Sequence, residues 1–254
     1  MERAALIFYL GLNNSQCADE SFSVPLVYWS PLFQGKSNIT FFKINFPSVP
    51  FPYYNLIYEN LFRSKMPFSF SKLPISGVIL IEPKIFPDDR GSFAELFKAS
   101  EFKANGIPGT FVQVNHSKSQ KNVLRGLHYQ LQPKAQAKLI SVIHGEIFDV
   151  VVDIRKGSPT YGKWAGQQLS AANKRMLYVP AGFAHDFCTL SDDTEIIYYC
   201  SEEYAPSLER NILWNDAAIG IKWPVSQPLL SPKDAGGKIL KDADNNFDFT
   251  NPGA

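Results

Sequence analysis

Short stretches rich in β-branched and aromatic residues recur along residues 66–254, and several alternate between apolar and polar positions. In the segment 110–117, Phe111, Gln113 and Asn115 predict one face of a strand, and the positions between them predict the other. Alternation of this kind, bounded by Gly, Pro, Asn and Asp, predicts strands at 75–82, 110–117, 138–155, 175–182 and 194–201.

The segment 138–155 is long enough for two strands, and we expect a hairpin turn at His144-Gly145. In its second half, positions 148, 150, 152 and 154 predict one apolar face. On the other face, Asp149 and Asp153 alternate with apolar residues. These two carboxylates suit acid–base chemistry or the anchoring of an arginine, and the sequence does not choose between the two roles.

Helical patterns are short and occur only near 100–105 and 234–241. Parallel α/β folds need helical stretches of about 10–15 residues between their strands, and none is found. Many short strands at short spacing favour an all-β sandwich or closed barrel, including the double-sheet jelly roll, with a few short helices.

Residues 1–65 differ from residues 66–254 in composition. They hold 14 of the 35 aromatic residues but only 9 of the 49 charged ones, and no pattern in them lasts long enough to predict an element. Three interpretations are open. The segment is a poorly packed extension, or an arm that binds a partner, or sequence upstream of the true translation start that has been read as protein, with Met66 as the actual first residue. We favour the third, which leaves residues 66–254 as one domain.

Charge and composition exclude several classes of protein. With 25 Lys and Arg against 24 Asp and Glu, the chain lacks the basic excess of a general nucleic-acid binder. No apolar run reaches the roughly 18 residues of a membrane span. The cysteines Cys17, Cys188 and Cys200 are too scattered for a disulfide scaffold or a cysteine-based zinc site, and they fit a reducing cytoplasm.

Two histidines are candidates for chemistry, because each follows a glycine closely in a strand-like segment. Arg125 lies three residues before His128, and Lys138 lies ten after it, whereas His185 stands in the later segment 178–187. A histidine can accept or donate a proton near neutral pH. An ammonium group close by can stabilise the oxyanion that forms when a proton is removed.

A metal site is not expected. Metal-binding jelly rolls of the cupin group use a His-x-His pair followed by a Glu, but His128-Tyr129-Gln130 lacks the second histidine. A catalytic zinc or iron ion normally needs three protein ligands. The sequence also lacks the G-x-G-x-x-G phosphate loop and the G-x-S-x-G nucleophile motif, so neither a dinucleotide cofactor nor a covalent hydrolase is predicted.

The stretch from about Ile75 to Leu240 resembles the dTDP-4-dehydrorhamnose 3,5-epimerase family of dTDP-L-rhamnose synthesis. The similarity lies in segments 86–97, 111–130, 137–164, 169–187, 195–216 and 219–235, in order. The resemblance implies a cupin-type jelly roll without metal or cofactor, usually a homodimer. It also implies the reaction, inversion of carbons 3 and 5 of a dTDP-4-keto-6-deoxyhexose through an enolate.

The resemblance implies a role for each matching residue. His128 corresponds to the general base, Asp234 to the carboxylate that orients it, Lys138 to the cation near the enolate oxygen and Tyr198 to the general acid. Arg90 and Arg125 match cations at the diphosphate or nucleotide end, and Tyr204 matches an aromatic that stacks on thymine. The other expected substrate contacts are Glu95, Gln113, Val114, Asn115, His185, Glu209 and Lys233.

The chain departs from the family pattern at two places. Arg210-Asn211 follows Glu209 where a small residue is common, and Asp186 follows His185 where Gly is frequent. Three rival functions stay open: a related enzyme that inverts carbon 3 only or acts on another nucleotide-linked 4-keto sugar, a non-catalytic module that binds sugar nucleotides, and a metal-dependent cupin oxygenase.

Overall fold

The computed structural model describes residues 5–7, 23–29, 40–45 and 67–249. Contacts between Cα atoms divide the chain into two units, Met1–Lys65 and Met66–Ala254. No helix in the described ranges is long and apolar enough to cross a membrane.

The described part of the first unit is an antiparallel sheet of three strands. Strand β2 (Ser23–Trp29) pairs with β1 (Ala5–Ile7) and with β3 (Thr40–Asn45). The sequence of this segment shows no pattern long enough to predict these three strands. Local periodicity does not reveal them, because their pairing joins residues that are separated along the chain.

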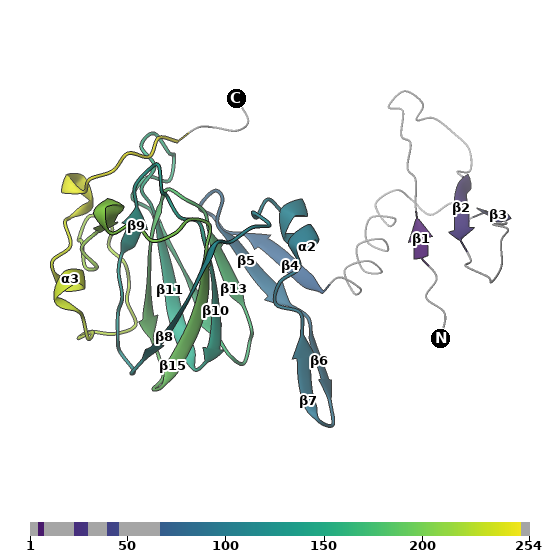
Figure 1. The fold of residues 1–254 in the computed structure, drawn as a ribbon, viewed down its shortest axis with the longest axis horizontal. Coiled ribbons are helices and arrows are strands. Elements are labelled where there is room, and N and C mark those ends of the chain that lie inside the picture. The colour runs from purple at the N-terminus through teal and green to yellow at the C-terminus, as the bar shows by residue number, and fades with distance from the viewer. Residues whose placement is uncertain (1–4, 8–22, 30–39, 46–66, 250–254) are drawn as a thin grey trace. The chain divides into compact units, whose positions relative to one another are not determined.

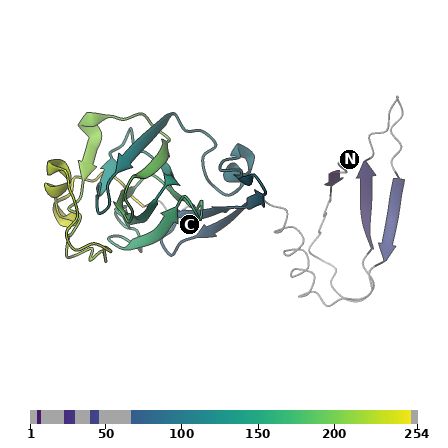
Figure 2. The same ribbon diagram turned by 90° about the horizontal axis from the view of Figure 1, so that it is seen from below.

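The second unit is built from two antiparallel sheets that face each other (Figures 1 and 2). The six-stranded sheet runs β4 (Phe68–Lys72), β5 (Ile79–Pro83), β13 (Met176–Val179), β10 (Lys138–His144), β15 (Thr194–Cys200) and β8 (Gln113–Ser119). The five-stranded sheet runs β12 (Trp164–Ser170), β11 (Glu146–Asp153), β14 (Phe183–Thr189), β9 (His128–Gln130) and β16 (Glu209–Asn211). The predicted all-β jelly roll is confirmed.

The remaining elements are small. Strands β6 (Ile85–Asp88) and β7 (Gly91–Ala94) form a separate hairpin. The helices are α2 (Ala99–Ala104) and α3 (Pro232–Ala235), and single 3-10 turns span Pro206–Leu208 and Leu240–Asp242. Helix α2 lies where the sequence predicts one, whereas the region 234–241 holds the end of α3 and the start of the last turn.

Three apolar clusters hold these layers together. The first lies between the two sheets, where Ile140 and Leu177 meet Val151 and Phe187. A second cluster lies on the outer face of the five-stranded sheet, covered by the segment after β16. The third covers the outer face of the six-stranded sheet and includes Phe102 of α2. Strand β11 contributes to the first two, so its predicted two faces are confirmed.

The expected hairpin at His144-Gly145 is wrong. Strand β10 pairs with β13 and β15, whereas β11 pairs with β12 and β14 in the other sheet. The turn therefore carries the chain from one sheet to the other. Gly145 has φ +77°, and a Cβ there would lie 2.5 Å from the Ser191 hydroxyl, so only glycine fits the crossing. Alternation along the two strands cannot distinguish a hairpin from such a crossing.

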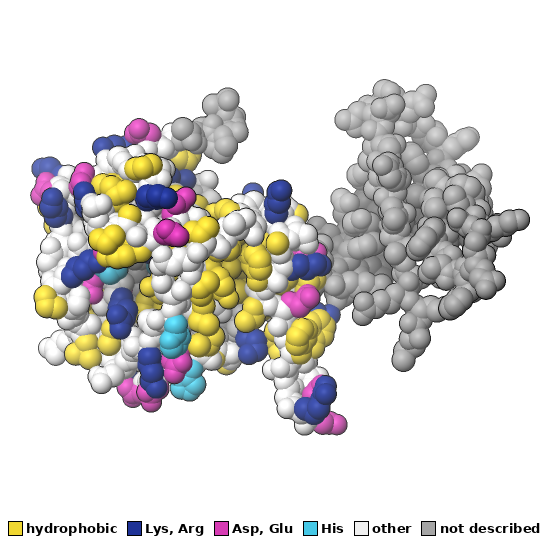
Figure 3. Space-filling view, viewed as in Figure 1, with side chains coloured by type: hydrophobic (Ala, Val, Ile, Leu, Met, Phe, Trp, Pro, Cys, Tyr) yellow, Lys and Arg dark blue, Asp and Glu magenta, His cyan; other side chains and the backbone are white. Residues whose placement is uncertain are grey.

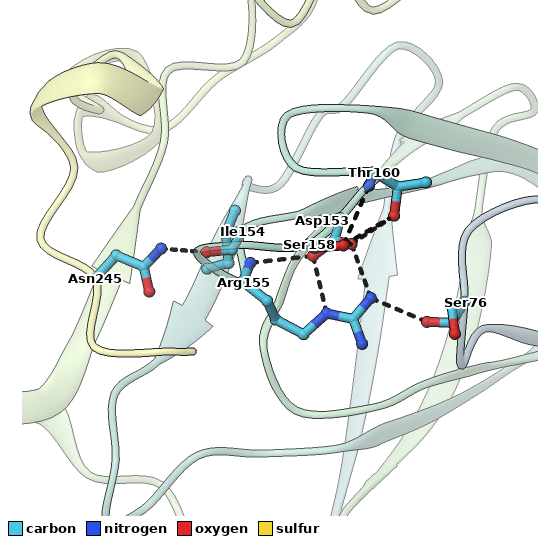
Figure 4. A network of polar contacts seen from close by, with 7 residues as sticks. All are labelled: Ser76, Asp153, Ile154, Arg155, Ser158, Thr160 and Asn245. Carbon is cyan, nitrogen blue, oxygen red and sulfur yellow. Dashed lines mark hydrogen bonds and ion pairs between the residues drawn. The ribbon is translucent and has the colours of Figure 1, made fainter. Parts of the chain in front are cut away.

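Asp153, at the end of β11, anchors the loop that follows it (Figure 4). Its buried carboxylate accepts hydrogen bonds from the backbone N–H and the guanidinium of Arg155, at 2.7–3.0 Å, and from the hydroxyls of Ser158 and Thr160, at 2.6 and 2.7 Å. Arg155 also donates to the Ser76 carbonyl and lies over the Phe183 ring. Of the two roles left open for Asp153, the contacts therefore match the anchoring of an arginine.

Candidate active site

A cavity of about 320 Å³ lies within the second unit. Its walls come from strands of both sheets and from α3, and they are rich in polar and charged groups. The lining residues are Ser117, Arg125, His128, Lys138, His185, Phe187, Tyr198, Glu209, Ser231, Lys233 and Asp234. Eight of the fourteen residues expected from the sequence are in this set.

His128 of β9 and Asp234 of α3 form the central pair. Nε2 of His128 lies 2.7 Å from Oδ1 of Asp234, and Ser231 donates a hydrogen bond of 2.7 Å to the other carboxylate oxygen. Burial would raise the pKa of Asp234, but the contacts with His128 and Ser231 hold it below its ordinary value. An ionised carboxylate on one ring nitrogen fixes the orientation of the imidazole and leaves the other nitrogen for proton transfer.

A second histidine–carboxylate pair lies in the next strands. His185 of β14 is the direct cross-strand neighbour of His128, and its Nε2 donates to both carboxylate oxygens of Asp149, at 2.9 and 3.0 Å. Asp149 is fully buried. The sequence leaves Asp149 unassigned, although its place among inward-facing positions of β11 was the signal that could have found it.

Lys138 and Tyr198 come from neighbouring strands of the opposite sheet. Tyr198 pairs with Ile140, so it lies two positions along β10 from Lys138. Burial lowers the pKa of Lys138, although nearby acidic groups, Cys200 and Glu209 foremost, oppose this. Burial raises the pKa of Tyr198, so its phenol keeps its proton at neutral pH.

Polar contacts link Tyr204, which is expected to stack on thymine, to four other expected substrate contacts. Glu209 accepts from the Tyr204 hydroxyl at 2.6 Å and pairs with Lys233 Nζ at 2.5 Å. The Tyr204 amide donates to Gln113 Oε1 at 2.7 Å, and the Gln113 side chain donates to Asn115. The Tyr204 side chain is about half exposed, so its ring is open to a ligand. Burial would raise the pKa of Glu209, but Lys233 and Tyr204 lower it.

Besides Gln113, Asn115 and Tyr204, three further expected residues are not among those that line the cavity. Arg90 stands at the tip of the β6–β7 hairpin, where its side chain is 89% exposed and pairs with Asp88 at 2.6 Å. Glu95, just after the hairpin, is exposed. Val114 is 56% exposed, on the face of β8 opposite to Gln113 and Asn115.

Ser117 of β8 is one of the cavity-lining residues. Its hydroxyl is buried and makes no hydrogen bond within the described residues. A buried hydroxyl without a partner costs free energy, so it favours a ligand that supplies one. Within the same described part of the chain, no three His, Cys, Asp or Glu side chains converge as metal ligands would.

Comparison with known proteins identifies the family. A family model described as dTDP-4-dehydrorhamnose 3,5-epimerase matches residues 72–242. The chain belongs to this family. The Shigella flexneri dTDP-4-dehydrorhamnose 3,5-epimerase is 56% identical over 174 residues, which cover 68% of this chain and 96% of that protein.

Solved structures of epimerases share the fold. One is dTDP-6-deoxy-D-glucose-3,5-epimerase from Legionella pneumophila in complex with dTDP-4-keto-L-rhamnose, with TM-score 0.67 and 48% identity over 70% of this chain and 95% of that one. Another is a 3'-monoepimerase from Streptomyces bikiniensis in complex with dTDP-quinovose, with TM-score 0.64 and 38% identity over 66% of this chain and 86% of that one. The fold thus occurs in both double and single epimerases.

Proposed function

We propose that this protein is a dTDP-4-dehydrorhamnose 3,5-epimerase, which converts dTDP-4-dehydro-6-deoxy-D-glucose to dTDP-4-dehydro-L-rhamnose. The observation that carries the proposal is the His128–Asp234 pair, at 2.7 Å, in the same cavity as Lys138 and Tyr198. Family membership and the ligand of the Legionella pneumophila structure support the choice of substrate.

The reaction begins with proton removal from carbon 3 or 5. The 4-keto group acidifies the hydrogens on both neighbouring carbons, and His128 takes one of them. The electron pair moves to the carbonyl oxygen, which becomes an enolate. Lys138 stabilises this oxygen, because an ammonium in a poorly solvated site interacts strongly with developing negative charge.

Inversion requires that a proton return from the opposite face of the ring. His128 belongs to the five-stranded sheet and Tyr198 to the six-stranded sheet, and the two sheets face each other. This placement supports Tyr198 as the acid that protonates the carbon on the side away from the base. Because burial raises the pKa of Tyr198, the phenol is protonated when the enolate forms. The steps repeat at the second carbon.

Exchange of substrate hydrogen with solvent tests this proposal. The purified protein is incubated with dTDP-4-keto-6-deoxyglucose in deuterated water, and the mass and position of label in the sugar are read. Two deuteriums, at carbons 3 and 5, are expected. A single deuterium at carbon 3 would instead match the monoepimerase activity of the Streptomyces bikiniensis relative. Binding without exchange would identify a non-catalytic module and overturn the proposal.

We further propose that the protein acts as a homodimer whose partner chain completes the site. Arg90 and Glu95 lie on or beside the protruding β6–β7 hairpin, away from the cavity of their own chain (Figure 1). The hairpin exposes Phe86 and Phe93, and Figure 3 shows hydrophobic side chains there. An exposed apolar hairpin carrying expected binding residues fits docking on a second copy. Light scattering should give twice the chain mass, and Phe93→Asp should reduce it to one chain.

We place the protein in a reducing compartment, as expected of the cytoplasm. Cys188 and Cys200 are buried and free of disulfides in the described residues. Burial raises the pKa of the Cys188 thiol to about 11, so it is a poor nucleophile. Thiol labelling of the protein denatured directly from the cell should find both cysteines reduced.

A further inference from the structure

Asp186 is a fully buried carboxyl that the proposed reaction does not use. It stands in β14 between His185 and Phe187, both of which line the cavity. Strand alternation turns Asp186 to the outer face of the sheet, where its cross-strand neighbour Val150 packs in the second apolar cluster. A carboxyl in such an apolar layer is costly unless its contacts compensate.

The contacts of Asp186 lead to the segment that carries the base. Its Oδ1 accepts hydrogen bonds from the backbone N–H of Arg125 at 2.9 Å and from that of Phe187 at 2.6 Å. Gly126 lies directly against it, because a Cβ on Gly126 would come within 2.8 Å of the Asp186 Cβ. The side chain therefore contacts residues 125 and 126, which stand three and two positions before His128.

Burial favours the neutral form of the Asp186 carboxyl. Oδ2 is buried and has no hydrogen-bond partner among the described residues. Burial raises the pKa of Asp186 well above its ordinary value, against the opposing effect of the Phe187 amide, and the nearby charge of Asp234 raises it further. The neutral acid costs less free energy to bury than the carboxylate does, and its Oδ1 still accepts the hydrogen bonds from the Arg125 and Phe187 amides.

We propose that Asp186 is a positioning residue that fixes the segment Arg125–His128 through the Arg125 amide. This inference rests on the proposed function and on the expectation, from the family resemblance, that Arg125 meets the diphosphate or the nucleotide end. The Arg125 side chain lines the cavity and is held at its other end by a 3.1 Å hydrogen bond from Nε to the Ser119 hydroxyl. With the amide held by Asp186 and Nε held by Ser119, the guanidinium has one fixed direction in which to meet a phosphate.

The test compares Asp186→Ala with Asp186→Asn in the full-length protein, with dTDP as the probe in titration calorimetry. Alanine removes the acceptor, and we expect the Kd for dTDP to rise about fivefold, as for the loss of one buried hydrogen bond. Asparagine keeps an oxygen at the Oδ1 position and should stay within about twofold of the wild type. If the alanine variant does not fold, Asp186→Val replaces it, since it fills the space without an acceptor.

A double-mutant cycle separates positioning from a general loss of stability. If Asp186 acts through Arg125, then Asp186→Ala should change the Kd by less than about twofold when Arg125 is already alanine. Equal effects in the two backgrounds, or equal Kd values for the alanine and asparagine variants, would overturn the proposal. Failure of the wild type to bind dTDP would instead overturn the proposed function itself, and this inference with it.

Discussion

Asp153 and the cavity residues are two groups of buried polar side chains in one jelly roll, and their hydrogen bonding differs. Both oxygens of Asp153 are used within the chain, by Arg155, Ser158 and Thr160. In the cavity, the Ser117 hydroxyl has no partner in the described residues. Asp153 therefore fixes the loop that follows β11, whereas the Ser117 hydroxyl in the cavity can still form a hydrogen bond with a ligand.

The two regions also differ in the kinds of charged group they hold. In the Asp153 network the cation is the guanidinium of Arg155. In the cavity the groups are histidines, a lysine and a tyrosine, which are the groups proposed above to exchange protons with the substrate or to stabilise its charge. We expect the fully hydrogen-bonded Asp153 network to contribute mainly to stability. We expect the cavity residues to contribute mainly to turnover. Variants that separate stability from turnover test this distinction.

The largest expected effect is on turnover. Replacing His128 by alanine removes the base, so kcat should fall by about 10²–10⁴-fold. The Kd for dTDP should change by less than about threefold, because Arg125, Tyr204 and Lys233 remain. Stopped assays of the sugar product and calorimetry with dTDP measure the two quantities. A variant that loses binding and turnover in proportion would contradict the role of His128 as base.

The opposite pattern is expected for Asp153→Ala. Removing the carboxylate leaves the Arg155 guanidinium, whose side chain is mostly buried, without its partner, and should lower the free energy of unfolding by about 3–5 kcal/mol. The kcat of the folded protein should stay within about twofold of the wild type. Urea denaturation gives the first value, and assays well below the melting temperature give the second. A large fall in kcat in fully folded protein would show that the two regions are not separable.

The dependence of stability on acid pH gives a second test of the structural role of Asp153. Burial would raise the pKa of Asp153, but Arg155, Ser158 and Thr160 lower it below 3.8 in the folded state. A lowered folded-state pKa gives stability that is complete above the unfolded value and is lost as pH falls through the folded one. Between pH 5 and pH 2, Asp153→Asn should therefore lose less stability than the wild type does. Equal losses would show that other carboxylates govern acid unfolding.

A smaller effect is expected on the pH dependence of turnover in the alkaline range. Burial lowers the pKa of Lys138 from 10.5, so the ammonium that stabilises the enolate should lose its proton below that pH, whereas burial raises the pKa of Tyr198 from 10.0. Turnover should therefore decline at a pH below 10.5. Lys138→Arg should be slower, by about tenfold, but its alkaline decline should move to higher pH because a guanidinium keeps its charge. An unmoved decline would assign it to another group.

The smallest expected effect is that of deleting residues 1–65. The cavity and the Asp153 network are both built from residues after Met66. Truncation should leave kcat/KM and the melting temperature within error of the full chain. Insolubility or lost activity of the truncated protein would favour the extension or partner-binding interpretations of this segment over an extraneous leader.

Much of the second unit follows from local pattern. Alternation in β8 and β11 predicts which side chains share a face, because successive side chains of a strand point to opposite sides. The resemblance to the epimerase family predicts His128, Lys138, Tyr198 and Asp234 as one site, and all four line one cavity. It does not predict the pairing of Asp149 with His185, since their contact depends on the register between β11 and β14.

The sequence by itself determined the strand content, the apolar faces and the residue types available for proton transfer. Only the tertiary structure decided that the chain crosses between sheets at Gly145, that Asp153 binds Arg155 while Asp149 binds His185, and that Arg90 lies away from the cavity. The physical reason is that alternation depends on neighbours along one strand. Pairing, burial and charge contacts depend on segments brought together from distant parts of the chain.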